Sequence, residues 1–143
     1  MQLNEATARR RFGSVPVVRL ATVDALGRPH LVVTTFVVDG DHIYLAVDQK
    51  PKTSRELKRV RNIRANPEVA ALADHYDDDW RRLWWVRADG SARITTDANL
   101  MAGPIELLTA RYPQYRSDPP RGPVIAITVT AWSGWAYTEP DRP

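Results

Sequence analysis

The chain has 143 residues, of which 43% are hydrophobic, and this length predicts one domain, residues 1–143, with a substantial core. There is no cysteine, which excludes disulfides, catalytic thiolates and zinc–thiolate sites. The formal net charge of +3 does not predict a broad nucleic-acid-binding face, although the pI of 9.5 leaves that alternative open.

No stretch approaches about 18 uninterrupted apolar residues, so we expect no membrane span. The arginines at residues 9–11 are similar to the start of a twin-arginine export signal, but proline and charged residues interrupt the apolar stretch that such a signal needs. We therefore expect a cytoplasmic protein that binds neither membranes nor nucleic acid.

The first part of the chain predicts one helix and a β-hairpin. Residues 3–12 have helical propensity, with Asn4 as the N-cap. Residues 17–24 and 30–38 are rich in Val, Thr and Leu, and Gly27 suits the turn between them. The second strand hardly alternates between apolar and polar residues, so we expect both of its faces to be covered, with a partner subunit as one candidate cover.

A turn at residues 39–41 and a third strand at 43–47 lead into a basic segment, residues 50–64, which carries seven cations and one acid. Thr53 and Glu56 have the T-x-x-E spacing of a capping box, so the segment predicts a helix of about three turns. The N-terminus of a helix offers unpaired N–H groups and partial positive charge. A phosphate there would meet donors, dipole and cations together.

An apolar stripe of Leu57, Val60 and Ile63 is expected to pack this helix, which leaves its cations on the other faces. The alternative interpretation is a cationic face that is only solvated, the usual result of a charge run.

The remaining strands are predicted at residues 69–74, 83–88 and 92–96, with a turn at Asp89-Gly90 between the last two. A helix at 98–112, broken at Gly103-Pro104, and a proline-rich loop at 113–123 follow. The final strand is expected at 124–137, bent or bulged at Ser133-Gly134, with a flexible tail from about residue 139. Successive strands with few helices exclude a doubly wound parallel sheet. We predict a mainly β chain, β with few α, that forms a six- to seven-stranded antiparallel barrel.

Three blocks of sequence, at residues 20–36, 43–47 and 57–72, resemble the split-barrel flavin and deazaflavin proteins related to pyridoxamine 5'-phosphate oxidase. A fourth block, at 74–94, resembles the actinobacterial branch of that family, which uses the deazaflavin coenzyme F-420 (8-hydroxy-5-deazaflavin). The resemblance implies an FMN-binding split barrel that forms a homodimer, with two cofactor sites at the subunit interface.

The resemblance also implies which residues bind the cofactor. The backbone of Val33, Thr34 and Thr35 would lie along the cofactor ring. The phosphate and its acidic tail would meet the cations and polar residues of the basic segment, Lys50, Lys52, Thr53, Arg55, Lys58, Arg59, Arg61 and Asn62. The oxidase itself carries an arginine and a lysine on this second strand, and the chain has neither charge there, so oxidation of vitamin B6 is not expected.

The chain shows no nucleophile or catalytic triad, which agrees with a hydride carrier, because a cofactor brings its own reactive carbon. Tyr76, Trp80 and Trp85 are candidates for a substrate pocket, with rim or interface positions as the alternative. Trp84 and Trp85 must point to opposite faces of a strand, so only one of them can line a given cavity. The three carboxylates at 77–79 cannot converge on one ion, so no metal site is predicted.

These observations lead to one interpretation and two alternatives. The interpretation is a homodimeric, coenzyme F-420-dependent oxidoreductase that transfers hydride between the reduced deazaflavin and a small organic substrate. The alternatives are an FMN-binding flavoprotein of the same fold and a non-catalytic module that binds a cofactor or haem.

Overall fold

The computed structural model describes residues 1–47 and 57–138. Its helices are α1 (Glu5–Ser14), α2 (Lys58–Ala65), α3 (Ala98–Arg111) and α4 (Pro113–Ser117), with a 3-10 turn η1 (Trp80–Arg82). Its strands are β1 (Val18–Val23), β2 (Pro29–Thr34), β3 (Val37–Asp39), β4 (His42–Ala46), β5 (Glu68–His75), β6 (Trp84–Thr95) and β7 (Val124–Ala136). The expected mainly β chain with few helices is confirmed, and the tail predicted from about residue 139 lies outside the described residues.

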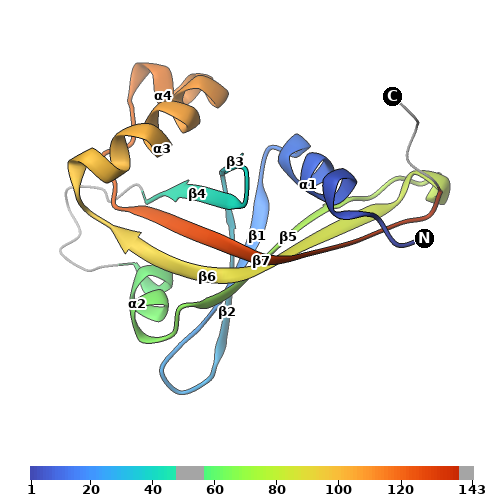
Figure 1. Cartoon of the computed structure of the whole chain (residues 1–143), viewed down its shortest axis with the longest axis horizontal. Coiled ribbons are helices and arrows are strands. Elements are labelled where there is room, and N and C mark those ends of the chain that lie inside the picture. Colours follow the sequence, from blue (N-terminus) through green and yellow to red (C-terminus); the bar gives the residue numbers. More distant parts are fainter. Residues whose placement is uncertain (48–56, 139–143) are drawn as a thin grey trace.

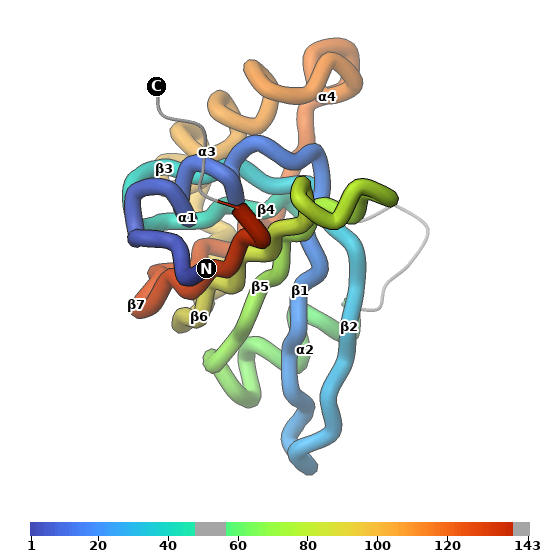
Figure 2. The backbone as a smooth tube through the Cα atoms, turned by 90° about the vertical axis from the view of Figure 1, so that its right-hand side faces the viewer, coloured from blue at the N-terminus to red at the C-terminus, as the bar shows by residue number. Residues whose placement is uncertain are grey.

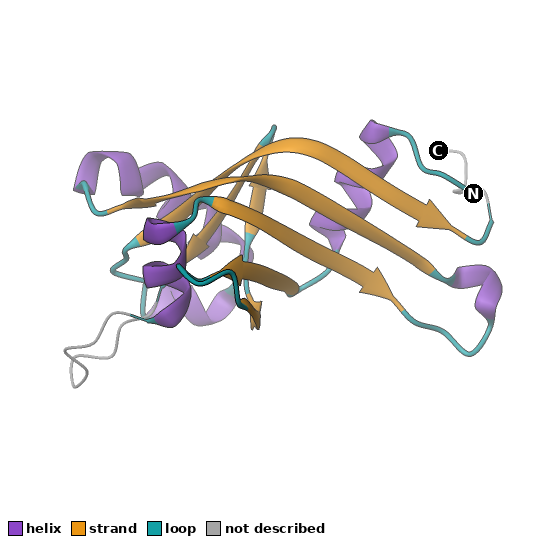
Figure 3. Cartoon of the chain, turned by 90° about the horizontal axis from the view of Figure 1, so that it is seen from below, coloured by secondary structure: helices purple, strands orange, loops and turns teal. Residues whose placement is uncertain are grey.

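The seven strands of the described chain form one antiparallel sheet in the order β2-β1-β5-β6-β7-β4-β3. The sheet is strongly curled around the long strands β6 and β7 (Figure 1). Seen from below, the strands make one curved surface with the helices along its margins (Figure 3). The fold is a curled half-barrel, which confirms the predicted split barrel.

The curl follows from a connection of two residues. β2 and β3 are the two edge strands of the sheet, yet only Thr35 and Phe36 lie between them. Such a connection spans at most about 11 Å, so the two edges of the sheet must approach each other. The prediction of a single strand at residues 30–38 is therefore wrong, because the chain leaves one edge and enters the other within this run.

α1 closes the inside of the curled sheet. Asn4 caps the helix as predicted, because its Oδ1 accepts a hydrogen bond of 2.8 Å from the backbone N–H of Thr7. The fully buried Phe12 packs edge-to-face on Phe36 and on Trp132, with ring centroids 5.2 Å apart in both pairs. This aromatic cluster joins the N-terminal helix, the β2–β3 connection and β7 in one core.

β6 runs without interruption through residues 84–95, so the predicted turn at Asp89-Gly90 is wrong. The irregularity is a bulge, since Asp89 pairs with Ala131 and Gly90 pairs with Val129, which leaves Thr130 as an extra residue of β7. The predicted bend of the final strand at residues 133–134 lies instead at this bulge. The glycine marks a close approach of two strands and not a reversal of the chain.

The helical region after β6 also differs from the prediction. α3 is continuous from Ala98 to Arg111 with Pro104 inside it, so the break predicted at Gly103-Pro104 is wrong. The segment predicted as a loop at residues 113–123 begins with the short helix α4, which has Pro113 at its first position. α3 and α4 lie at the opposite end of the molecule from the tip of the β1–β2 hairpin (Figure 2).

α2 begins at Lys58, with Leu57 as an N-cap that makes no side-chain hydrogen bond. The start predicted from the Thr53–Glu56 capping box is therefore wrong, and those two residues lie outside the described part of the chain. The predicted apolar stripe is confirmed, because Val60 and Ile63 are buried in the core. α2 packs against β1 and β6. Because β1 is the neighbour of the edge strand β2, α2 lies close to that edge of the sheet.

Gly90→Ala is expected to lower the free energy of unfolding by about 1–3 kcal/mol, because a Cβ atom there would lie 2.4 Å from the backbone oxygen of Thr128. The matched control is Gly103→Ala in α3, where a Cβ atom meets nothing within 4 Å and helix propensity predicts a gain of about 0.5–1 kcal/mol. Chemical denaturation measures both variants. Equal stability of the two variants would contradict the strand pairing at the bulge.

Candidate functional site

The residues predicted to face a cofactor ring lie at the end of an edge strand. Among the described strands β2 pairs only with β1, so its outer edge carries backbone N–H and C=O groups that no described strand uses. Val33 is 61% exposed, whereas Thr34 is buried. Thr35 follows the strand at the β2–β3 connection. The strand edge is thus available to a planar ligand.

Of the α2 cations that were predicted to bind the cofactor, only Arg59 is partly buried in the described structure. Burial lowers the pKa of its guanidinium, and the nearby Tyr115 hydroxyl raises that pKa by a smaller amount. Within the residues that the structure describes, no carboxylate pairs with Arg59. A partly desolvated cation without an acidic partner is a costly arrangement that an anion would relieve.

The other predicted residues of the basic segment have different surroundings. Lys58 and Arg61 are exposed to solvent on α2. Asn62 is buried, and its Nδ2 donates a hydrogen bond of 3.0 Å to the Oγ1 of the buried Thr22 on β1. This side chain anchors α2 to the sheet. The remaining predicted residues, Lys50, Lys52, Thr53 and Arg55, lie outside the described part of the chain, so their contacts with a cofactor stay predictions.

Sequence reasoning missed Tyr115, because the segment that carries it was predicted to be a loop. α4 places the Tyr115 hydroxyl 2.9 Å from the Oγ1 of Thr35, at the end of β2. The same hydroxyl interacts electrostatically with Arg59 on α2. Two segments that are far apart in the sequence therefore bring two hydroxyls together, and the guanidinium of Arg59 from a third segment lies within electrostatic range of them. Only the tyrosines of the 112–115 segment were available as a signal in the sequence.

The turn between α3 and α4 is fixed to the β2–β3 connection. Arg111 donates through Nη1 to the backbone oxygen of Phe36 at 2.7 Å and through Nη2 to the backbone oxygen of Val15. The Tyr112 hydroxyl accepts a hydrogen bond of 3.0 Å from the N–H of Phe36 and donates to the backbone oxygen of Pro16 at 2.8 Å. Burial raises the pKa of the Tyr112 phenol, which keeps it a neutral donor.

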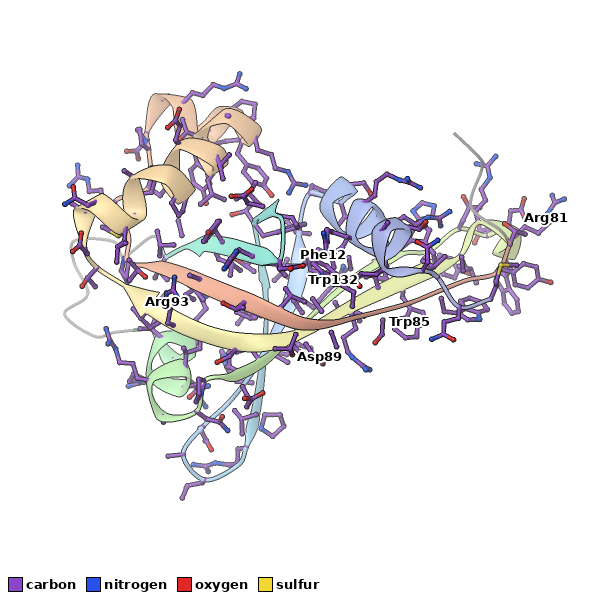
Figure 4. The ribbon with its side chains drawn as sticks, viewed as in Figure 1. Phe12, Arg81, Trp85, Asp89, Arg93 and Trp132 are labelled. Atoms are coloured by element: carbon purple, nitrogen blue, oxygen red, sulfur yellow. The ribbon has the colours of Figure 1, made fainter. Side chains whose placement is uncertain are left out.

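A second feature is an open, apolar groove of about 780 Å³ on the outer face of the sheet. Figure 4 shows Trp85 and Asp89 on this face, whereas Phe12 and Trp132 lie on the side of the core. The groove is lined by residues of β1, β2, β5, β6 and β7, among them Ala21, Leu31, Leu72, Tyr76, Trp85 and Trp135. Trp84 packs against the core and Trp85 is 37% exposed, yet both line the groove. The prediction that only one of them can line a given cavity is therefore wrong.

Two of the three predicted pocket residues, Tyr76 and Trp85, line this groove. Trp80 does not, because η1 leaves it 62% exposed beyond the end of β5. The groove also contains the ion pair of Arg19 and Asp74, whose Nη1 and Oδ1 atoms are 2.8 Å apart. Arg87 also lines the groove, and its Nε lies 3.1 Å from Oδ2 of Asp89, so both arginines in the largely apolar walls are paired with a carboxylate.

A family model of pyridoxamine 5'-phosphate oxidase matches residues 5–136. The chain belongs to the pyridoxamine 5'-phosphate oxidase family. The matched stretch contains every strand of the described sheet, so family membership and the split barrel support each other. A comparison with curated protein sequences finds no match.

Solved structures share the fold of this family member at low sequence identity. An FAD-binding protein from Mesorhizobium loti is 19% identical with a TM-score of 0.74, and the match covers 94% of this chain and 95% of that one. A conserved hypothetical protein from Mycobacterium tuberculosis is 22% identical with a TM-score of 0.75 over 94% and 86% of the two chains. The haem storage protein HutZ from Vibrio cholerae is 17% identical with a TM-score of 0.67 over 92% and 90%. At these identities the likeness shows the fold alone.

The three carboxylates at residues 77–79 lie between the end of β5 and η1. Asp79 caps η1 and accepts hydrogen bonds from Arg81 Nε and Nη2 at 3.0 and 2.9 Å. In the described ranges, no group of three or more His, Asp or Glu side chains is arranged to hold a metal ion. None of the described helices has the length and apolar character needed to cross a bilayer.

Asn62→Ala is expected to lower the free energy of unfolding by about 1–3 kcal/mol, because the Thr22 hydroxyl would lose its partner inside the protein. The control is the double variant Asn62→Ala, Thr22→Val, which should lose less than the sum of the two single variants. Urea denaturation gives the three values. Strict additivity would show that the two side chains do not interact.

Proposed function

We propose that the protein is a cytoplasmic, homodimeric oxidoreductase that binds a phosphate-bearing, flavin-type cofactor and transfers hydride between it and a small organic substrate. Within that class we propose coenzyme F-420 as the cofactor, with FMN as the alternative. The proposal rests mainly on Arg59, a partly buried cation for which the described residues supply no acid. Phosphate is a strong partner for a guanidinium, because it accepts two parallel hydrogen bonds.

The residues present fit such a cofactor. Arg59 and the hydroxyls of Thr35 and Tyr115 supply one cation and two polar groups for a phosphoryl group. The outer edge of β2 offers backbone donors and acceptors, and the exposed Val33 offers an apolar surface for a ring. This combination of polar end and apolar body matches the two parts of a flavin or deazaflavin nucleotide.

The bound cofactor would supply the carbon that carries the hydride. The chain itself would bind the phosphate through Arg59, orient the ring along β2 and exclude water from the site. These tasks agree with the absence of cysteine from the sequence, since a thiolate nucleophile is not needed. The apolar groove would accept a small organic substrate between aromatic walls.

Two observations favour coenzyme F-420 over FMN. The block at residues 74–94 resembles the branch of the family that uses the deazaflavin. The basic segment at 50–64 contains seven cations, more than one phosphate needs, and a polyglutamate tail would use the others. The similarity of fold to the FAD-binding protein from Mesorhizobium loti supports the flavin alternative, and the similarity to HutZ supports a haem-binding module.

A homodimer is part of the proposal, because the outer face of the sheet leaves large apolar side chains exposed. Leu31 is 66% exposed, Val33 is 61% exposed and Trp85 is 37% exposed. These three lie on the face that carries the groove, and a continuous apolar surface of this kind marks an interface. A second copy of the chain would cover it and would complete the wall of the cofactor site.

Titration with cofactors tests the proposed function directly. Purified protein is expected to bind coenzyme F-420 and to change its deazaflavin absorbance spectrum on titration. A yellow preparation with flavin bands would favour FMN, and an intense Soret band with haem would favour the haem-binding module. Failure to bind either a flavin or a deazaflavin would overturn the proposal.

Arg59→Ala is expected to weaken cofactor binding by about tenfold or more, because it removes a charge-assisted hydrogen bond to phosphate. Arg61→Ala, the matched control on the exposed side of α2, should weaken binding less and lose that effect as salt is raised. Fluorescence titration gives the affinities, and thermal unfolding checks that both variants fold. Equal affinities for Arg59→Ala and the parent protein would contradict the assigned phosphate site.

Trp85→Glu is expected to convert the dimer to a monomer, because it places a charge in the apolar surface proposed to be buried. Trp80→Glu is the control, since Trp80 lies outside the groove and is 62% exposed. Light scattering after size-exclusion chromatography measures the mass. A parent protein that is monomeric at micromolar concentration, or a dimeric Trp85→Glu variant, would argue against this interface.

A further inference from the structure

We propose that Tyr115 of α4 is a phosphate-binding residue, which makes the site prefer cofactors that carry a phosphoryl group over the same ring systems without one. This inference rests on the proposed function and adds a residue to the same site. No sequence pattern pointed to Tyr115, and the structure alone brings it to the end of β2.

The first argument concerns hydroxyl hydrogens. Tyr115 and Thr35 each carry one O–H donor, and the 2.9 Å contact between their oxygens uses only one of the two. For the other hydroxyl hydrogen, no acceptor is found among the residues that the structure describes. Thr35 and Tyr115 are only partly buried, so this hydrogen is open to solvent in the free protein and is available to a phosphoryl oxygen.

The second argument concerns charge. The Tyr115 hydroxyl is close enough to Arg59 to raise the pKa of the guanidinium, which burial lowers more strongly. The Tyr115 hydroxyl is placed by its 2.9 Å contact with Thr35 at the end of β2, and the Arg59 guanidinium from α2 lies within electrostatic range of it. A guanidinium and a donor hydroxyl, with no carboxylate from the described residues, form a site for an anion and not for a cation or an apolar group.

The third argument concerns rigidity. Arg111 and Tyr112 fix the start of α4 to backbone groups of Val15, Pro16 and Phe36. The Tyr112 and Tyr115 rings also pack edge-to-face, with centroids 5.7 Å apart. Because Tyr115 is held in place before any ligand arrives, its contact with a phosphate costs little ordering entropy. Such support is typical of a side chain in a preformed binding site.

Tyr115→Phe tests the inference, because it removes the hydroxyl and keeps the ring. Two ligand pairs are compared by fluorescence titration: FMN with riboflavin, and coenzyme F-420 with its phosphate-free core, the 8-hydroxy-5-deazaflavin ring with a ribityl chain. One of the two ligand pairs is expected to bind the parent protein. For that pair, we expect Tyr115→Phe to lower the affinity for the phosphate-bearing ligand by about tenfold and to change the affinity for the phosphate-free ligand by less than about twofold. The pair that shows the effect also distinguishes FMN from the deazaflavin as the source of the phosphate.

Tyr137→Phe is the matched control, because Tyr137 is 52% exposed and follows β7, where its backbone N–H bonds to Leu83 next to η1. It should leave all four affinities unchanged. If Tyr115→Phe does not fold, Tyr115→Met makes the same comparison with a flexible side chain that also lacks a donor.

Each of the following results would overturn the inference. Equal weakening of both members of a pair would show that Tyr115 only supports the shape of the site, and unchanged affinities would show that it makes no contact. If Arg59→Ala weakens binding and Tyr115→Phe does not, the proposed function survives without Tyr115. If the parent protein binds none of the four ligands, the proposed function fails, and the role of Tyr115 fails with it.

Discussion

The two residues between β2 and β3 set the geometry of the whole molecule. Because Thr35 and Phe36 join the two edges of a seven-stranded sheet, the sheet has to curl until those edges meet. The curl creates the inside space that Phe12 fills and the outside face that carries the groove. It also brings the end of β2 to the place where α4 is fixed by Arg111. The candidate phosphate site therefore lies at the seam of the split barrel.

Two polar groups at this seam lack a partner among the described residues. Arg59 lacks an acid and the Thr35–Tyr115 pair lacks an acceptor among the described residues. A phosphoryl group is suited to either of them, as a partner for the guanidinium and as an acceptor for the hydroxyl. The outer face of the sheet has the complementary character, since it is largely apolar and the arginines of its groove are already paired, Arg19 with Asp74 and Arg87 with Asp89. A polar end for a cofactor phosphate and an apolar face for a ring, a substrate and a second subunit are thus separate parts of one sheet.

Local features of the fold could be predicted from the sequence, whereas features that depend on closure could not. The Asn4 cap and the Gly27 turn involve neighbouring residues, and both are confirmed. The break at Thr35, the uninterrupted β6 and the helix α4 depend on contacts between distant segments, and periodicity does not report these. For the candidate site, the basic helix pointed to Arg59. The burial of Asn62 and the arrival of Tyr115 required the structure.

The central claim is that an anion completes the seam between α2, α4 and the end of β2. The most direct measurement is a crystal structure of the protein with its bound flavin or deazaflavin cofactor. The account predicts a phosphoryl oxygen at about 2.7–2.9 Å from the guanidinium nitrogens of Arg59. A phosphoryl group bound elsewhere, with the Arg59 side chain still lacking an anion, would contradict it.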